Sequence, residues 1–190
     1  RNAARYFYDQ LNAPTPEAAM ARRYWREKRG LSDAAIRRFG LGYAPEDFVG
    51  LLHYLRHRGF TEPELESSGL VKRSAKGNLY DIFRHRVMVP IIDVRGAIIA
   101  FGGRVLDDSK PKYINSPETM VYKKSRTLFA LNVAKKSPNK RYVLCEGYMD
   151  VISMHEAGFD TAVCACGTAL TPEQVKLLTE YADEVVLSYD

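Results

Sequence analysis

The chain has 190 residues, of which 46% are hydrophobic and 27% are charged, and its formal net charge is +5. This length suits one large domain or two small ones, and the composition is ordinary for a globular protein that buries a core. The sequence contains neither an apolar run near the roughly 20 residues that span a bilayer nor a signal-peptide pattern, so we expect no membrane partner.

The first third of the chain is predicted to be helical. Thr15 is a typical helix N-cap before a proline, and Gly30 predicts the end of that helix. Ser32 opens a second, short helix, and Thr61 opens a capping box. The predicted helices span 15–30, 32–39, 47–58 and 61–69.

The middle third changes to the pattern of strands. Two short apolar runs, 86–93 and 97–101, lie on either side of the turn residues 94–96. Such a pair of runs predicts a β-hairpin. The segment 110–118 follows and is expected to be extended, because two prolines interrupt it.

The last third alternates strands with helices. The predicted order is a strand that ends at Glu146, a helix over 150–157, a strand over 161–165, a helix over 171–181 and a strand that ends at Asp190. This order implies right-handed crossovers and a parallel sheet. The fold class is therefore predicted as α/β, with an α+β amino-terminal subdomain (1–136) before a partial parallel-sheet subdomain (137–190), divided in the loop 135–140.

Two acidic residues end predicted strands of this parallel sheet. Glu146 and Asp190 each follow an apolar run, and the carboxyl ends of parallel strands meet at one edge of a sheet. Hard carboxylate oxygens are the ligands that divalent cations prefer, so the pattern predicts a metal site. Asp150 begins a predicted helix and is either a third acidic ligand or a helix cap.

Basic residues are concentrated in the middle of the chain. Residues 72–126 carry 12 basic and 5 acidic side chains, a net charge of +7, whereas residues 127–190 carry a net charge of −4. Arg84 and Arg86 are two residues apart and are expected to face one side of a strand. Tyr113 and Tyr122 lie beside lysines and offer stacking surfaces for bases. The pattern favours a nucleic-acid or nucleotide track over an ordinary solvated surface.

The three cysteines, Cys145, Cys164 and Cys166, fall in apolar runs. An odd number of cysteines without a disulfide framework is typical of proteins from a reducing compartment. We therefore expect a cytoplasmic protein in which these residues are small, buried parts of the core.

Several runs resemble signatures of one family. Residues 83–91 (Phe83-Arg84-His85-Arg86-Val87-Met88-Val89-Pro90-Ile91) resemble a signature of bacterial DNA primases, as do residues 101–106 and 111–119. The run Glu146-Gly147-Tyr148-Met149-Asp150-Val151-Ile152 is similar to the Toprim motif of that family, and Gly167-Thr168-Ala169-Leu170-Thr171 follows it. The motifs occur in the family's order and extend over nearly the whole chain.

The resemblance implies the RNA polymerase domain of a replication primase, which makes short RNA primers on single-stranded DNA by metal-dependent nucleotidyl transfer. Glu146 matches the Toprim glutamate, which is implicated in metal binding and proton transfer. Asp190 matches the first aspartate of an Asp-x-Asp pair that binds Mg²⁺ or Mn²⁺. Tyr113 and Asn115 match the nucleotide pocket. The family's basic positions, which contact template, nucleotide or primer, fall on Arg38, Arg84, Arg86, Arg104, Lys112 and Lys124.

The resemblance also implies partners and missing parts. Single-stranded DNA, ribonucleoside triphosphates and the RNA primer are the expected ligands. The second aspartate of the pair would lie beyond residue 190. Zinc is expected only in an amino-terminal domain, and the replicative helicase is expected to bind a carboxyl-terminal domain, neither of which is in this sequence. We therefore expect residues 1–190 to be inactive by themselves.

Two alternatives remain open. Another Toprim enzyme, a nuclease or topoisomerase, would share the acidic strand ends but would not predict the basic block before Glu146. A non-catalytic module that binds single-stranded nucleic acid would share the basic block, and its affinity would fall steeply with salt without any dependence on metal.

Overall fold

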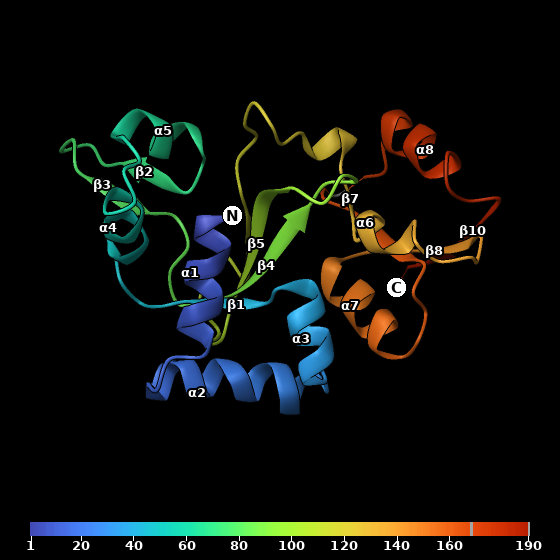
Figure 1. Ribbon diagram of the computed structural model, residues 1–190, viewed down its shortest axis with the longest axis horizontal. Helices are drawn as coiled ribbons and strands as arrows, with labels where there is room; N and C mark the ends of the chain where they lie inside the picture. The colour runs from blue at the N-terminus through green and yellow to red at the C-terminus, as the bar shows by residue number, and fades with distance from the viewer. Residues whose placement is uncertain (168, 190) are drawn as a thin grey trace.

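The computed structural model describes residues 1–167 and 169–189, and it contains two four-stranded sheets and one small hairpin. In Figure 1 the first large sheet occupies the centre and the second lies to its right, between α8 above and α7 below. No helix in the described part of the chain is long and apolar enough to cross a membrane. The helices are α1 (Asn2–Leu11), α2 (Pro16–Arg23), a π-helical turn η1 (Tyr24–Lys28), α3 (Asp33–Phe39), α4 (Gly50–Arg56), α5 (Glu62–Ser67), a 3-10 turn η2 (Lys124–Arg126), α6 (Leu131–Ala134), α7 (Tyr148–Glu156) and α8 (Pro172–Thr179).

The strands fall into the three sheets as follows. The first sheet has the order β1-β4-β5-β6, the second has the order β10-β8-β9-β7, and β2 pairs with β3. The strands are β1 (Gly42–Ala44), β2 (Val71–Arg73), β3 (Leu79–Asp81), β4 (Arg86–Ile92), β5 (Ile98–Val105), β6 (Tyr113–Asn115), β7 (Leu128–Phe129), β8 (Arg141–Cys145), β9 (Ala162–Ala165) and β10 (Glu184–Ser188).

Side-chain caps fix the helix starts that the sequence predicts. The hydroxyls of Thr15 and Ser32 accept hydrogen bonds from backbone N–H groups three residues later, and Glu64 completes the capping box with Thr61. The helix expected over 47–58 is shorter and begins at Gly50, because the Asp47 carboxylate accepts from the N–H of Val49 and holds a turn there.

The β4–β5 hairpin confirms the prediction for the middle of the chain. The Asp93 carboxylate accepts from the backbone N–H groups of Arg95 and Ala97, which closes the turn. Strand β5 continues to Val105, beyond the predicted end, and Gly103 lies opposite Met88 of β4. Strands β1 and β6 complete the sheet on its two edges.

The second sheet confirms the predicted parallel order. Strands β10, β8 and β9 are parallel, with Ser188 opposite Cys145 and Cys145 opposite Cys164. Strand β8 ends at Cys145, so Glu146 is the first residue after it. The unpredicted strand β7 lies before residue 136 but pairs antiparallel with β9. The division of the chain at 136 stays a prediction, and this strand links its two sides.

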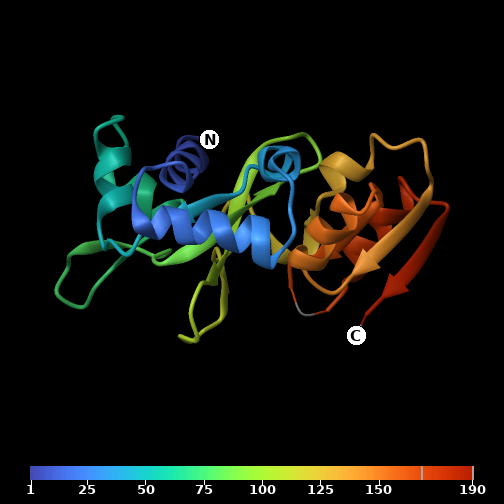
Figure 2. The ribbon, with the colours of Figure 1, turned by 90° about the horizontal axis from the view of Figure 1, so that it is seen from below.

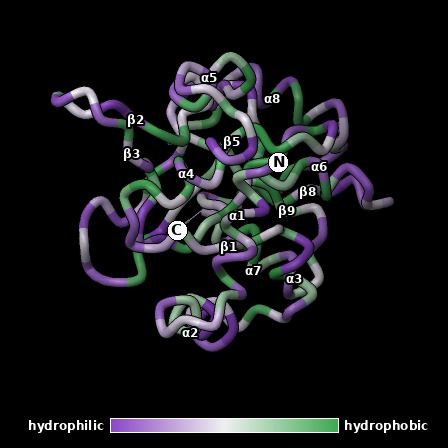
Figure 3. The backbone as a smooth tube through the Cα atoms, turned by 60° about the vertical axis from the view of Figure 1, so that its left-hand side comes forward, coloured by the Kyte–Doolittle hydropathy of each residue, from purple (hydrophilic) through white to green (hydrophobic). Residues whose placement is uncertain are grey.

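One apolar core joins the two large sheets. It contains Val87 and Val89 from β4 together with Cys145 and Cys164 from β8 and β9, all at most 2% exposed. The third cysteine, Cys166, belongs to the same cluster, so the predicted burial of the cysteines is confirmed. In Figure 3 hydrophobic segments gather around β5, β8 and β9, whereas the projecting loops are largely hydrophilic. The shared core fixes the two sheets relative to each other.

Asp81 is a buried acid at the end of β3. Only 3% of it is exposed, and its carboxylate accepts from the N–H groups of Leu51 (2.8 Å) and Leu52 (2.9 Å) in the first turn of α4. Burial raises the pKa of Asp81 from 3.8 to about 6, although the two N–H donors act in the opposite direction. The carboxylate therefore joins β3 to α4 and titrates above its ordinary range.

Replacing Asp81 with asparagine is expected to flatten the pH dependence of stability. Because its folded pKa is the higher one, the contribution of Asp81 to stability is complete below about pH 4 and is lost as the pH rises to about 6. A shift of this size corresponds to at most about 3 kcal/mol. Urea unfolding of both proteins at pH 4, 5, 6 and 7 measures it. If the free energies of unfolding of the two proteins change in parallel between pH 4 and pH 7, the raised pKa of Asp81 is contradicted.

Candidate active site

A cleft of about 820 Å³ lies between the two large sheets. Its walls come from β6, from the end of η1, from η2 and from the loops that follow β8 and β9. In Figure 2 the carboxyl ends of β8 and β10 are directed toward the side of the molecule from which the β2–β3 hairpin and the β5–β6 loop project. The polar side chains in its lining are Arg29, Tyr113, Asn115, Lys124, Glu146, Tyr148 and Asp150.

The acidic wall of the cleft is formed by Glu146 and Asp150, both of which are exposed. Glu146 directly follows β8, where a strand end fixes its backbone. The Oδ2 atom of Asp150 accepts from the N–H of Gly147 at 3.0 Å, so Asp150 caps α7 and keeps its other oxygen available. A smaller hollow of about 270 Å³ adjoins both residues and reaches Ser188 at the end of β10. The other predicted ligand, Asp190, lies outside the described residues.

The donor set at this edge fits a hard divalent cation. Within residues 1–167 and 169–189, no group of three or more His, Cys, Asp or Glu residues is arranged to hold a metal ion. Mg²⁺, however, is commonly held by one or two carboxylates together with water and substrate phosphates. Glu146 and Asp150 supply two carboxylates beside open space, which matches that kind of site.

Cationic side chains line the opposite part of the cleft. Lys124 is half-buried in η2, and its backbone N–H donates to Glu118 while its carbonyl accepts from Gln174. Arg29 directly follows η1, and its Nε donates to the hydroxyl of Tyr24 at 2.8 Å. Arg29 is not predicted as a site residue, because nothing in the helical pattern separates it from the neighbouring basic residues Arg26 and Lys28.

Arg104 lies next to this wall in β5. It is 8% exposed, and its guanidinium carbon lies 5.0 Å from the ring centroid of Tyr24 and 5.8 Å from that of Tyr113. The Tyr24 ring is thus approached by two guanidiniums, since that of Arg29 lies 5.4 Å from the same centroid. Burial raises the pKa of Tyr24, against the opposing effect of Arg29. These contacts hold cations beside the cleft without neutralising them.

Two buried polar groups beside the cleft find no hydrogen-bond partner among the residues that the structure describes. The Nδ2 atom of Asn115 donates to the carbonyl of Cys166 at 3.5 Å, which ties β6 to the loop after β9, but its Oδ1 atom is unpaired. The hydroxyl of Tyr148 is also unpaired, and burial raises its pKa. The Tyr148 ring lies against Gly102, where a Cβ atom would approach it to 2.9 Å. A ligand in the cleft could supply the missing partners.

The other predicted residues lie away from the cleft lining. Arg86 is 7% exposed and donates to the carbonyls of Pro111 (2.9 Å) and Lys112 (3.2 Å), which anchors the segment before β6. Lys112 is exposed. Arg38 is exposed on α3 and lines a separate, small hollow with Phe129.

The expectation that Arg84 and Arg86 face one side of a single strand is wrong. Strand β4 begins at Arg86, and His85 before it has φ of 48°, in the left-handed region. Arg84 therefore precedes the strand and turns toward the end of β3, where its Nη1 donates to the carbonyl of Asp81. Positive φ at a residue other than glycine gives no signal in the sequence.

Comparisons with known proteins match both parts of the chain. The family model described as DNA primase catalytic core, N-terminal domain, matches residues 6–135, and a Toprim-like family model matches residues 143–190. The DNA primase of Clostridium acetobutylicum is 48% identical over 189 residues, which are 99% of this chain and 31% of the relative. The DNA primase of Deinococcus radiodurans is 49% identical over 166 residues, 85% of this chain and 29% of the relative. The chain thus spans about a third of the length of these relatives.

Solved structures agree with the sequence matches. The RNA polymerase domain of Mycobacterium tuberculosis primase DnaG superposes with a TM-score of 0.89 at 37% identity, over 99% of this chain and 63% of that one. A DnaG primase catalytic domain bound to single-stranded DNA has a TM-score of 0.88 at 39% identity, over 97% of this chain and 59% of that one. The sequence matches and the fold therefore agree, and the chain belongs to the bacterial DNA primase family.

Proposed function

We propose that the protein to which these residues belong synthesises short RNA primers on a single-stranded DNA template by nucleotidyl transfer in the cleft. The observation that carries this proposal is that one cleft is lined both by exposed carboxylates, Glu146 and Asp150, and by the cations Arg29 and Lys124. A nucleoside triphosphate matches both kinds of group, because its phosphates attract cations and its reaction requires divalent metal. A related catalytic domain bound to single-stranded DNA supports the choice of template.

Different side chains of the cleft would have different roles in such a reaction. Arg29 and Lys124 would hold phosphate oxygens, and the half-exposed ring of Tyr113 would stack on a base. Glu146, with Asp150 and Asp190, would hold Mg²⁺ or Mn²⁺. When bound, this ion neutralises part of the negative charge on the phosphoryl group that is transferred. Asn115 would accept a hydrogen bond from the nucleotide through its unpaired Oδ1 atom.

The wider assembly belongs to the same proposal. The ligands would be single-stranded DNA, ribonucleoside triphosphates and the growing RNA primer, in the cytoplasm. A zinc-binding amino-terminal domain and a carboxyl-terminal domain that binds the replicative helicase would belong to the longer protein. Outside the cleft lining, Arg38, Arg84 and Lys112 would contact template or primer. The buried Arg86 would serve nucleic-acid binding by anchoring the segment before β6, and the buried Arg104 by its charge beside the cleft.

A primer-synthesis assay of the intact protein tests the proposal. The reaction contains single-stranded DNA, the four ribonucleoside triphosphates and Mg²⁺, and we expect short RNA products that require template and metal. Degradation of the DNA would support the nuclease alternative, relaxation of supercoiled DNA would support the topoisomerase, and salt-sensitive binding without products would support the binding module. The expected inactivity of residues 1–190 by themselves stays a prediction, which the same assay tests.

A further inference from the structure

Phe48 is a large apolar side chain on the surface of the first subdomain. It is 60% exposed and precedes α4, and it does not belong to the apolar core beside it. The guanidinium carbon of Arg84 lies 4.4 Å from the centroid of its ring. The same guanidinium lies 5.5 Å from the ring centroid of Tyr80 in β3. An arginine is thus stacked on an aromatic ring that water largely surrounds.

Backbone hydrogen bonds hold this pair in place. Arg84 donates from Nη1 to the carbonyl of Asp81, and the N–H of Asp81 donates to the carbonyl of Phe48 at 2.7 Å. The Asp81 carboxylate accepts from the first turn of α4, which begins two residues after Phe48. Both the ring and the cation are therefore positioned by one buried residue before any ligand arrives.

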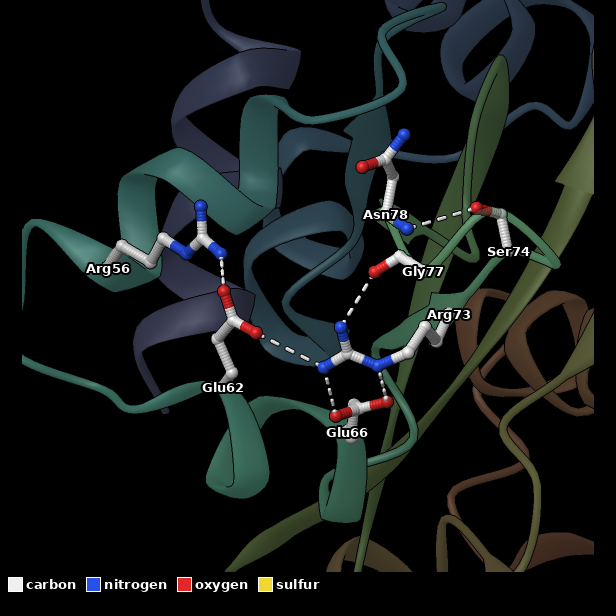
Figure 4. Close-up of polar contacts among 7 residues, drawn as sticks. All are labelled: Arg56, Glu62, Glu66, Arg73, Ser74, Gly77 and Asn78. Atoms are coloured by element: carbon white, nitrogen blue, oxygen red, sulfur yellow. Dashed lines mark hydrogen bonds and ion pairs between the residues drawn. The ribbon is translucent and has the colours of Figure 1, made fainter.

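The hairpin that carries Tyr80 is also fixed. Figure 4 shows Arg73 of β2 between Glu66 and Glu62, with a further hydrogen bond to the carbonyl of Gly77. Glu62 also pairs with Arg56 at the end of α4. These contacts join β2, α5 and α4, so the strand beside Arg84 has a defined position.

The charge of Arg84 lowers the pKa of Asp81 but is not neutralised by an ion pair to any residue that the structure describes. Within the part of the chain that the structure describes, the ion pairs of the arginines involve other residues, and Arg84 makes none. Its hydrogen bond to the Asp81 carbonyl uses one of five N–H donors. A guanidinium with free donors beside an exposed ring matches one nucleotide, whose phosphate pairs with the cation and whose base stacks on the ring.

The region around Phe48 and Arg84 is linked to the cleft through Arg86 and the segment before β6. Arg86, two residues after Arg84, donates to the carbonyls of Pro111 and Lys112 just before Tyr113, which lines the cleft. In Figure 2 the β2–β3 hairpin and the β5–β6 loop project to the same side of the molecule. A single strand that leaves the cleft on this side would run toward the hairpin beside Arg84.

We propose that Phe48, together with Arg84, forms a base-stacking site for one nucleotide of the single-stranded template, separate from the cleft. This inference rests on the proposed function, because it requires that the protein bind single-stranded DNA. Phe48 would stack on any of the four bases, because every base has a flat apolar face.

Tryptophan fluorescence of the intact protein tests this site directly. Trp25, the only tryptophan of this chain, is fully buried. Phe48→Trp places an exposed indole at the site, and we expect oligo-dT to quench its added fluorescence, with reversal by salt. The matched control is Phe159→Trp, since Phe159 is 53% exposed on the second subdomain, and we expect no quenching there. Equal quenching of the two variants, or none in Phe48→Trp, would overturn the proposal.

Affinity measurements separate stacking from a structural effect. Phe48→Ala is expected to weaken binding of oligo-dT by roughly 5- to 150-fold, the range of one base–aromatic stack. Phe48→Tyr retains the ring and should restore the affinity, and an abasic oligonucleotide should bind Phe48→Ala and the unsubstituted protein equally. An equal loss with the abasic strand would overturn base stacking. If the unsubstituted protein fails to bind oligo-dT, the proposed function fails instead.

Discussion

Glu146→Gln in the intact protein is expected to lower primer synthesis by at least about 100-fold while the fold is retained. Positioned proton-transfer groups contribute on the order of 10²- to 10⁴-fold, and an amide is neither a base nor a good ligand for Mg²⁺. Glu146 is exposed at the end of β8 and lines the cleft, so the isosteric change leaves the core intact. Primer yield at saturating nucleotide, together with the melting temperature, measures the effect.

The matched control is Glu156→Gln, on the last turn of α7. Glu156 is also exposed, and its Oε2 accepts from the hydroxyl of Ser32 at 3.0 Å, away from the cleft lining. We expect this variant to retain its activity. Near-normal primer yield from Glu146→Gln would show that Glu146 is not part of the active site. A large fall in the melting temperature of Glu146→Gln would show that Glu146 has a structural role.

Gly42→Ala is expected to destabilise the protein by about 3 kcal/mol. Helix α1 crosses β1 so closely that a Cβ atom on Gly42 would lie 2.7 Å from the Cβ, 2.8 Å from the carbonyl carbon and 2.9 Å from the carbonyl oxygen of Phe7. Because two of these atoms are backbone, α1 must move, and overpacking of this kind costs about 1–3 kcal/mol or more. Thermal unfolding followed by circular dichroism should show a fall of roughly 6–12 °C.

Gly167→Ala is the control for that prediction. A Cβ atom on Gly167 would meet no heavy atom within 4 Å, so we expect its melting temperature to stay close to that of the unsubstituted protein. If both glycine variants melt at the same temperature, the close crossing of α1 over β1 is wrong.

The elements predicted correctly are those that local chemistry specifies. A hydroxyl cap needs only a residue and its third neighbour, which is why Thr15 and Ser32 mark helix starts in both sequence and structure. The β4–β5 turn is similarly local, since Asp93 closes it through its own neighbours. Helix α1 has no side-chain cap at its start, and β7 has only two residues, so neither produces a pattern that distinguishes it.

The acidic part of the candidate site could be predicted from the sequence, because the order of the strands determines where it lies. Glu146 and Asp150 follow a strand end, and the rule for parallel sheets places them at a ligand-binding edge. Arg29 reaches the cleft because η1, with its buried Tyr24, packs beside Arg104 of β5, and no local pattern encodes that packing. The placement of Arg84 depended on the backbone of His85. Tertiary packing therefore decided which cations line the cleft.

Photoaffinity labelling with 8-azido-ATP tests most directly whether the cleft between the two sheets holds the nucleotide. After irradiation of the intact protein with Mg²⁺ and template, we expect mass spectrometry to find the label on peptides that contain Tyr113 or Lys124, with protection by excess ATP. Both residues line the cleft. Labelling confined to peptides outside the cleft, such as the one that contains Arg38, or labelling that excess ATP does not reduce, would contradict the account.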